Sequence, residues 1–289
     1  MISMPLSKKS LIVIAGPTAS GKSKLGIMLA KKINGEIISA DSRQVYRDLD
    51  IGTGKITKKE MRGVPHYCLD VASPKKIFTV DDFKNCAEQA LEKIYSKSKT
   101  PILVGGSGFY ISNTIYRTNL PKVKPNPSLR KKLNKKDAEE LFMMLKKIDP
   151  RRAKTIDRHN PRRLIRAIEI VIKTGKPVPM IKKTTRDNTK IIFLNPPPTK
   201  LKKRIAERTK KMLKRGLLAE VKRLRKKLSR KRLFELGFEY KYPLLYLEGK
   251  ISKPEMIERI NTETWHYAKR QLTYFKKMKN VRLNPQTWM

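Results

Sequence analysis

LIVIAGPTASGKS, residues 11–23, joins an apolar run to the pattern G-x-x-x-x-G-K-[ST]. This pattern is typical of a phosphate-binding loop between a buried strand and a helix. Its glycines let backbone N–H groups converge on phosphate oxygens, and the helix N-terminus adds partial positive charge. The sequence therefore predicts that a diphosphate or triphosphate binds here, with Lys22 neutralising a phosphate and Ser23 holding Mg²⁺. The predicted loop residues are Gly16, Pro17, Thr18, Ala19, Ser20, Gly21, Lys22 and Ser23.

Four short apolar runs are typical of parallel strands buried on both faces: residues 11–15, 36–40, 101–104 and 190–194. Helical patterns lie between them, for example at residues 80–95. Because strand and helix alternate, we expect the α/β class with right-handed crossovers, here a P-loop NTPase-like parallel sheet core.

The composition changes between residues 121 and 189, where prolines cluster at both ends and the pattern between them is helical, without a convincing strand. This predicts a mostly helical insertion domain. The expected boundaries are residues 1–117 for the first part of the α/β core, 118–189 for the insertion, and 190–289 for completion of the core and the C-terminal helices.

The charge balance is strongly basic, with 68 Lys and Arg against 25 Asp and Glu, a net charge of +43. Such a surface favours a polyanionic partner, nucleic acid first. No apolar run approaches the length of a spanning helix, so we expect a cytoplasmic protein without a membrane partner, and a monomer by default. Cys68 and Cys86 lack metal or disulfide spacing, and the three histidines are scattered. Both thiols are expected to be reduced.

Two charged residues stand out beside the predicted loop. Asp41 is the only carboxylate at the end of one of these strands, and strand ends of a parallel sheet gather at one edge. It could ligate Mg²⁺ through water, accept a proton, or cap the following turn. Arg208 falls on the buried stripe of a helical pattern starting near residue 198 and interrupted at Gly216. It either faces an anion or extends its charged end to solvent.

Seven segments in order make the sequence similar to the tRNA dimethylallyltransferase family. They are GPTASGKS (16–23), DSRQVYRDLDIGTGK (41–55), LVGGSGFY (103–110), the DP…RRLIRAIEI helix (149–170), ERTKKMLKRGLLAEV (207–221), LGFEYK (236–241) and YAKRQLTYF (267–275). Two local departures exist: residues 54–56 stand where Ala-Lys-Pro is usual, and LGFEYK replaces a more common Gly-Tyr-Lys pattern. No zinc is expected, because the Cys and His pairs of the eukaryotic finger are not found in this sequence.

The resemblance implies transfer of a dimethylallyl group from dimethylallyl diphosphate to the N6 amine of adenosine 37, next to the tRNA anticodon, with release of diphosphate. A nucleotide hydrolase normally ends another strand in a second acid that positions Mg²⁺ and water, and the strands here supply none. This absence is expected for prenyl transfer, since no water attacks phosphorus. Residues 16–23, Mg²⁺ and Arg208 would bind the charge that grows on the departing diphosphate. Asp41 would take the proton of the amine. Thr18 would hydrogen-bond either the diphosphate or the carboxylate.

The resemblance also implies contacts with the tRNA anticodon stem-loop, whose target nucleotide must leave its stack. The arginines near residue 162 have an alternative role as a solvated face paired with Glu169. Tyr267, Tyr274 and Phe275 either stack on bases or belong to the core. The implied tRNA contacts are Asp41, Ser42, Arg43, Gln44, Ser107, Arg130, Arg162, Arg163, Leu164, Ile165 and Arg166, with residues 234–239 as a further segment.

Two other functions fit parts of the sequence. A small-molecule or nucleoside kinase could use the same loop, with Asp41 activating a hydroxyl and the insertion acting as a lid. An RNA-binding factor switched by nucleotide would need a water-positioning acid, and the strand ends supply none. Labelled dimethylallyl diphosphate and labelled ATP distinguish these functions.

Overall fold

The computed structural model describes residues 10–118, 121, 123–180 and 183–278. The chain divides into two compact units. We call residues 1–117 and 185–289 the core unit and residues 118–184 the insertion unit.

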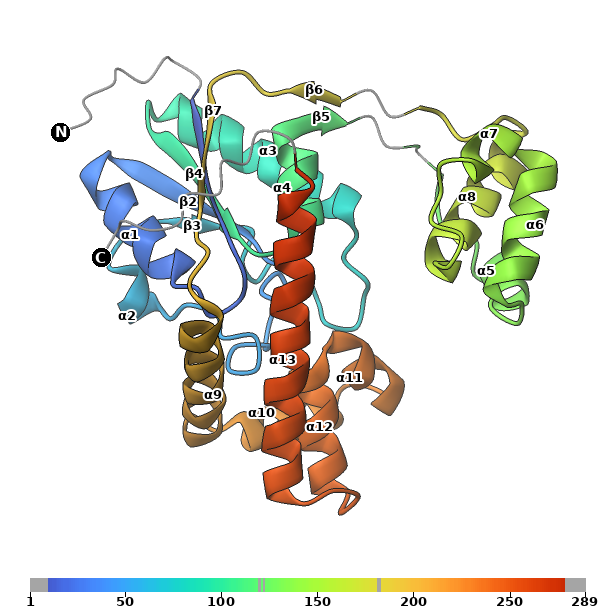
Figure 1. Cartoon of the computed structure of the whole chain (residues 1–289). Helices are drawn as coiled ribbons and strands as arrows, with labels where there is room; N and C mark the ends of the chain where they lie inside the picture. Colours follow the sequence, from blue (N-terminus) through green and yellow to red (C-terminus); the bar gives the residue numbers. More distant parts are fainter. Residues whose placement is uncertain (1–9, 119–120, 122, 181–182, 279–289) are drawn as a thin grey trace. The chain divides into compact units, whose positions relative to one another are not determined.

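A five-stranded parallel sheet forms the centre of the core unit, with strand order β3-β2-β4-β1-β7 (Figure 1). Central strand β1 pairs Val13 with Leu103 of β4 and with Ile191 of β7. The side chains of β1 and of residues 101–104 in β4 are apolar and buried, as the continuous apolar runs predicted. The α/β class is thus confirmed. The strands are β1 (Leu11–Ala15), β2 (Gly35–Ala40), β3 (His66–Tyr67), β4 (Thr100–Gly105) and β7 (Thr189–Phe193).

Helices cover both faces of this sheet. On one face Ile27 of α1 packs with Ile12 and Ile37, and on the other Phe83 of α3 belongs to the cluster that contains Val13. Alternate residues of each strand thus serve opposite layers. The covering helices and their short neighbour are α1 (Lys22–Lys32), α2 (Lys58–Met61), α3 (Val80–Ser96) and α4 (Gly108–Ile115).

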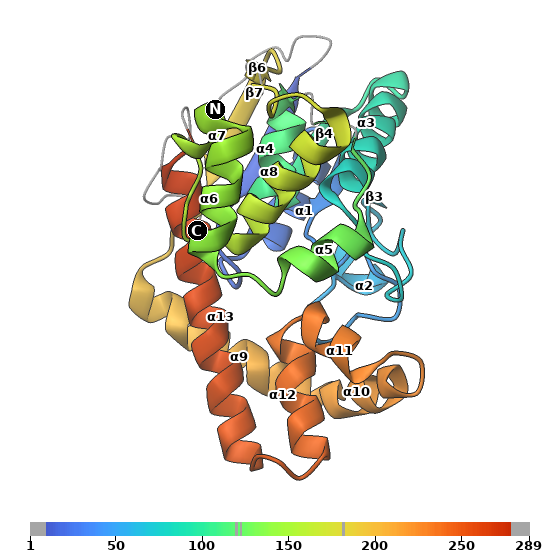
Figure 2. The same ribbon diagram turned by 90° about the vertical axis from the view of Figure 1, so that its right-hand side faces the viewer.

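Five further helices complete the core unit: α9 to α12 lie below the sheet in both views, and the long α13 rises from them to the level of α4 (Figure 1 and Figure 2). The chain turns between the first two at Gly216, whose φ of 97° is in the left-handed region that favours glycine. This is where the sequence predicted an interruption. The helices are α9 (Pro198–Lys214), α10 (Leu217–Arg225), α11 (Arg230–Leu236), α12 (Phe238–Leu247) and α13 (Lys253–Lys276).

The insertion unit is a small helical cluster around Leu141, Leu145, Leu164 and Ile168. Each helix begins at an Asn or Asp whose side chain accepts a backbone N–H, and three of them have proline in the first turn. The helices are α5 (Pro127–Leu133), α6 (Ala138–Ile148), α7 (Pro150–Ala153) and α8 (Pro161–Thr174).

Two expectations from the sequence are corrected. Residues 121–189 do contain a strand, β6 (Lys183–Thr185), which pairs with β5 (Tyr116–Thr118), and β7 already begins at Thr189. Cys68 and Cys86 form a disulfide across a Cα–Cα distance of 6.1 Å, so the expectation of reduced thiols is wrong for this structure. Cys86 lies on α3, which packs beside β3, and this tertiary proximity has no signature in cysteine spacing.

Candidate functional site

The predicted phosphate-binding loop, residues 16–23, connects β1 to α1 in the core unit. A side chain at Gly16 would meet the Leu194 carbonyl at 2.6 Å, so the chain needs glycine where it leaves the sheet. Lys22 folds back over the loop, and its Nζ donates to the Pro17 carbonyl at 2.6 Å. The loop therefore presents the start of α1 and a lysine to one side, an arrangement suited to an anion.

Burial lowers the pKa of Lys22 to about 7. The negative charge of Asp41 opposes this shift, whereas the positive charge of Arg208 adds to it. The ammonium is thus poorly neutralised by the protein alone. A bound anion would supply the missing charge.

Arg208 reaches from α9 to the same loop. Its Nη1 donates to Thr18 Oγ1 at 3.1 Å, and its Nη2 donates to the Thr53 carbonyl at 2.8 Å. Of the two orientations that the sequence left open, the charged end of Arg208 takes the one directed at the phosphate loop. Two cationic side chains therefore converge on residues 16–23.

Asp41 follows β2 and contributes to the Lys22 pKa. Its Oδ1 accepts the backbone N–H groups of Arg43 at 2.8 Å and Gln44 at 3.3 Å. One carboxylate oxygen thus caps the turn, the simplest of the three roles considered. The arrangement fixes the direction of the carboxylate, whose Oδ2 can still act as a base.

Ser42 and Ser107 tie the Asp41 turn to the end of β4. Ser107 Oγ accepts the Ser42 N–H at 3.0 Å, and Ser107 N donates to the Ala40 carbonyl at 3.2 Å. Tyr267 of α13 hydrogen-bonds Ser107, and burial followed by the charge of Asp41 raises the pKa of Tyr267 to about 12. The Gln44 side chain contacts a different segment, because its Nε2 donates to the Thr53 carbonyl at 3.4 Å.

Gln271 of α13 is a site residue that the sequence interpretation missed. Its Oε1 accepts the Thr18 N–H at 2.8 Å, and its Nε2 donates to the Gly106 carbonyl at 2.8 Å. The side chain is buried and joins the phosphate loop to the loop after β4. The sequence does give one indication of this residue: Gln271 is an amide on the buried face of the helix, between Ala268 and Phe275.

Glu239, in the first turn of α12, is an acid at the site that the sequence interpretation included only as part of segment 234–239, an implied tRNA contact. Burial raises its pKa to about 7, against the lowering effect of Arg208 and Arg43, while Asp41 raises it further. Its carboxyl group therefore shares the electrostatic environment of Asp41. The LGFEYK segment contained this residue, but nothing in its spacing indicated an acid at the site.

A family model described as IPP transferase matches residues 44–278. The chain belongs to the IPP transferase family. The tRNA dimethylallyltransferases of Lachnoclostridium phytofermentans and Acetivibrio thermocellus are 43% and 41% identical to it, each over 94% of this chain and 90% of the relative. The resemblance inferred from the seven segments is therefore confirmed.

Solved structures of the family have the same fold. The full-length tRNA isopentenylpyrophosphate transferase from Bacillus halodurans is 38% identical with a TM-score of 0.71, covering 94% of this chain and 88% of that one. A eukaryotic dimethylallyltransferase acting on tRNA is 33% identical with a TM-score of 0.82, covering 93% of this chain and 70% of that one.

The insertion-unit residues implied by the family resemblance fall into three groups. Arg130 and Arg166 both ion-pair with Glu169, which is buried. Burial alone would raise the pKa of Glu169, but hydrogen bonds from Arg130, the Asn126 amide and Arg166 lower it to about 2. Both arginines are thus engaged within the unit. The side chains of Leu164 and Ile165 are buried in its core, and those of Arg162 and Arg163 are exposed.

The three aromatic residues of α13 that the sequence singled out, Tyr267, Tyr274 and Phe275, have different surroundings. Phe275 is fully buried and packs against Phe193. Tyr274 hydrogen-bonds Ser112 through its hydroxyl, and Tyr267 packs edge-on against Phe238. Phe275 is therefore a core residue, whereas Tyr267 borders the site through Ser107.

The described part of the chain contains neither a metal-binding cluster of side chains nor a helix able to span a membrane. Within residues 10–278, apart from those outside the description, no three His, Cys, Asp or Glu side chains gather as a metal-binding group. No described helix has the length and apolar character required to cross a bilayer.

The Lys22 pKa predicts proton uptake when an anion binds. At pH 8 the amine is mostly neutral in the free protein, because its pKa is about 7. Inorganic diphosphate should raise that pKa and draw in a proton. Titration calorimetry at pH 8, in buffers of different ionisation enthalpy, measures the number of protons.

Lys22→Arg is the control. Arginine is charged before and after binding, so it takes up no proton, whereas any change in the protonation of the diphosphate itself is the same for both proteins. Wild-type protein should take up more protons than the variant, by a number approaching one. Equal proton numbers would contradict the assignment of Lys22 to the anion site.

Proposed function

We propose that this chain is a tRNA dimethylallyltransferase that moves the dimethylallyl group of dimethylallyl diphosphate to N6 of adenosine 37, beside the tRNA anticodon, and releases diphosphate. The family membership supports the activity. The observation that carries the assignment of residues is the convergence of Arg208 and Lys22 on residues 16–23, with Asp41 beside them.

The leaving group explains the two cations. During transfer the bond between the allylic carbon and the bridging oxygen breaks, and negative charge grows on the departing diphosphate. Hydrogen bonds to the Pro17 carbonyl, the Thr18 hydroxyl and the Thr53 carbonyl hold Lys22 and Arg208 at the phosphate loop, which supports this role for them. Pre-oriented donors stabilise developing charge without further reorganisation. Thr18 contributes by orienting Arg208 through its hydroxyl.

Asp41 is the proposed base. As N6 bonds to the allylic carbon, the amine becomes acidic and must lose a proton. The capped turn holds Asp41 Oδ1 on the backbone and leaves Oδ2 to accept this proton. The proton then passes to solvent, so the products are prenylated adenosine and diphosphate. General-base assistance of this kind contributes about 10²- to 10⁴-fold.

Mg²⁺ fits the donors at the loop. Ser23 is exposed in the first turn of α1, so its hydroxyl is open to a ligand. One hydroxyl with diphosphate oxygens and water matches the few protein ligands that Mg²⁺ usually takes. A bound Mg²⁺ would neutralise part of the diphosphate charge, and Ser23 is the residue that would hold it.

The charge distribution supports tRNA as the second substrate. The net charge of +43 favours a polyanion, and exposed Arg162 and Arg163 begin a helix of the insertion unit, where they could contact backbone phosphates. Ser42, Arg43, Gln44 and Ser107 surround Asp41 and would meet the nucleotide. We further propose a cytoplasmic monomer whose insertion domain is the compact unit of residues 118–184, slightly shorter than the range 118–189 expected from the sequence.

A single assay tests the activity. Purified protein is incubated with unmodified tRNA and either labelled dimethylallyl diphosphate or ATP labelled in its terminal phosphate, and the nucleosides are analysed. We expect label from the prenyl donor on N6 of the anticodon-adjacent adenosine. Label from ATP on RNA or a small acceptor, with that adenosine unmodified, would overturn the proposal in favour of a kinase.

Asp41→Asn tests the base. Asparagine keeps an oxygen acceptor for the Arg43 and Gln44 amides but cannot take the proton at neutral pH. The turnover number should fall about 10²- to 10⁴-fold with little change in the dissociation constant for tRNA. Asp48→Asn is the control, because the carboxylate of this aspartate pairs with Lys227 at 3.5 Å on the surface, and its contact with Arg223 goes through the backbone carbonyl. Near-normal turnover by Asp41→Asn would remove Asp41 from the mechanism.

A further inference from the structure

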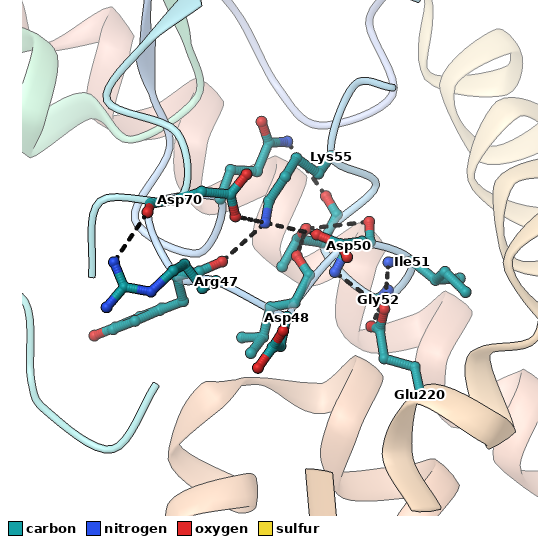
Figure 3. A network of polar contacts seen from close by, with 12 residues as sticks. Arg47, Asp48, Asp50, Ile51, Gly52, Lys55, Asp70 and Glu220 are labelled. Carbon is teal, nitrogen blue, oxygen red and sulfur yellow. Dashed lines mark hydrogen bonds and ion pairs between the residues drawn. The ribbon is translucent and has the colours of Figure 1, made fainter. Parts of the chain in front are cut away.

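Glu220 of α10 is a buried carboxylate that accepts hydrogen bonds from three consecutive backbone N–H groups, those of residues 50–52. The next residue, Thr53, is the one whose carbonyl binds Arg208. Oε2 of Glu220 accepts Asp50 N at 3.0 Å and Ile51 N at 2.8 Å, while its Oε1 accepts Gly52 N at 2.9 Å. Glu220 is only 3% exposed. Figure 3 shows it reaching from its helix to the backbone of Ile51 and Gly52.

This arrangement requires a carboxylate. Four donors point at two oxygens, because the Tyr240 hydroxyl also donates to Oε1 at 3.1 Å. An ionised carboxylate has acceptors only, so it satisfies all four, whereas an amide would turn its own N–H groups toward some of them. The substitution Glu220→Gln would therefore keep the shape of the side chain and lose part of its hold on the turn.

Two glycines let the turn approach its neighbours closely. A Cβ at Gly52 would lie 2.7 Å from the Tyr240 ring, and a Cβ at Gly54 would lie 2.5 Å from Arg208 Nη2. The turn is thus packed against Tyr240 on one side and against the guanidinium on the other. Its position decides where the Arg208 guanidinium can lie.

The carbonyl of Thr53 links the position of this turn to the position of the Arg208 guanidinium. It accepts Arg208 Nη2 at 2.8 Å, and it lies directly after Gly52, the last amide held by Glu220. The Thr53 hydroxyl donates to the Leu49 carbonyl at 2.7 Å, which closes the turn. Fixing the amides of residues 50–52 therefore fixes the direction of the carbonyl that holds Arg208.

Lys55 secures the far end of the same turn. Its buried ammonium pairs with Asp50 at 2.7 Å and with Asp70, and it donates to the Tyr46 carbonyl at 2.8 Å (Figure 3). The turn is thus held from both ends, by a carboxylate at its amides and by an ammonium at its side chains.

We propose that Glu220 is a positioning residue for Arg208: by binding the amides of residues 50–52 it holds the Thr53 carbonyl, and through it the guanidinium, toward the phosphate loop. This inference rests on the proposed role of Arg208 in binding the donor diphosphate. The four hydrogen bonds of Glu220 go to residues 50–52 and Tyr240 rather than to the phosphate loop, so its effect on the reaction should depend on Arg208.

A double-mutant cycle tests this dependence. kcat/KM for dimethylallyl diphosphate is measured for wild type, Glu220→Gln, Arg208→Ala and the double variant, below the unfolding temperature of each. Glu220→Gln should lower kcat/KM about 10-fold in the wild-type background and by less than about twofold when Arg208 is alanine. The KM for tRNA should stay unchanged.

Glu36→Gln is the matched control. Glu36 is also buried and accepts from Tyr67, Lys97 and Lys99, but it lies near the start of β2, whereas Asp41 follows its end. This variant should lower the melting temperature and leave kcat/KM within about twofold of wild type in both backgrounds. It separates loss of stability from loss of positioning.

The outcomes are distinguishable. If Arg208→Ala keeps wild-type kcat/KM, the proposed function of Arg208 fails. If Arg208→Ala is impaired but Glu220→Gln causes the same loss in both backgrounds, the positioning role of Glu220 fails. Should Glu220→Gln not fold, Tyr240→Phe replaces it in the cycle. That variant frees one bond of Glu220 and should show a smaller loss with the same dependence on Arg208.

Discussion

Two positive side chains, Lys22 and Arg208, are held beside one phosphate loop, and the rest of the site depends on this unfavourable proximity. The charge of Arg208 adds to the burial that lowers the pKa of Lys22. Neutral groups hold both cations: the Pro17 and Thr53 carbonyls and the Thr18 hydroxyl. Because these acceptors only partly offset the charge, the two side chains favour an anion beside the loop, as the proposed binding of diphosphate requires.

The architecture brings the partners of this pair from distant parts of the chain. Parallel strands β1, β2 and β4 end at the same edge and deliver the phosphate loop, the Asp41 turn and the Ser107 loop. Helices α9 and α13 then add Arg208 and Gln271. Glu220 and Lys55 hold the turn that receives Arg208, so residues without a direct role in chemistry set its geometry.

Local patterns predicted the parts of the site that depend on neighbouring residues in sequence. The phosphate loop was readable because strand, glycines, lysine and helix are contiguous, and Asp41 because it ends an apolar run. Arg208 was found by helical spacing, although spacing alone could not choose its direction. Contacts between distant elements left no such pattern. Gln271 and Glu220 are polar residues on otherwise buried helix faces, and their partners lie 253 and 170 positions away. The Cys68–Cys86 disulfide was likewise set by tertiary packing.

The central claim is that the diphosphate leaves as an intact group from the phosphate loop. It is tested most directly with dimethylallyl diphosphate that carries ¹⁸O at the oxygen joining the allylic carbon to phosphorus. This donor is turned over with unmodified tRNA. The account predicts that the label is recovered in the released diphosphate, because the carbon–oxygen bond breaks. Diphosphate without the label, produced as the adenosine is modified, would contradict it.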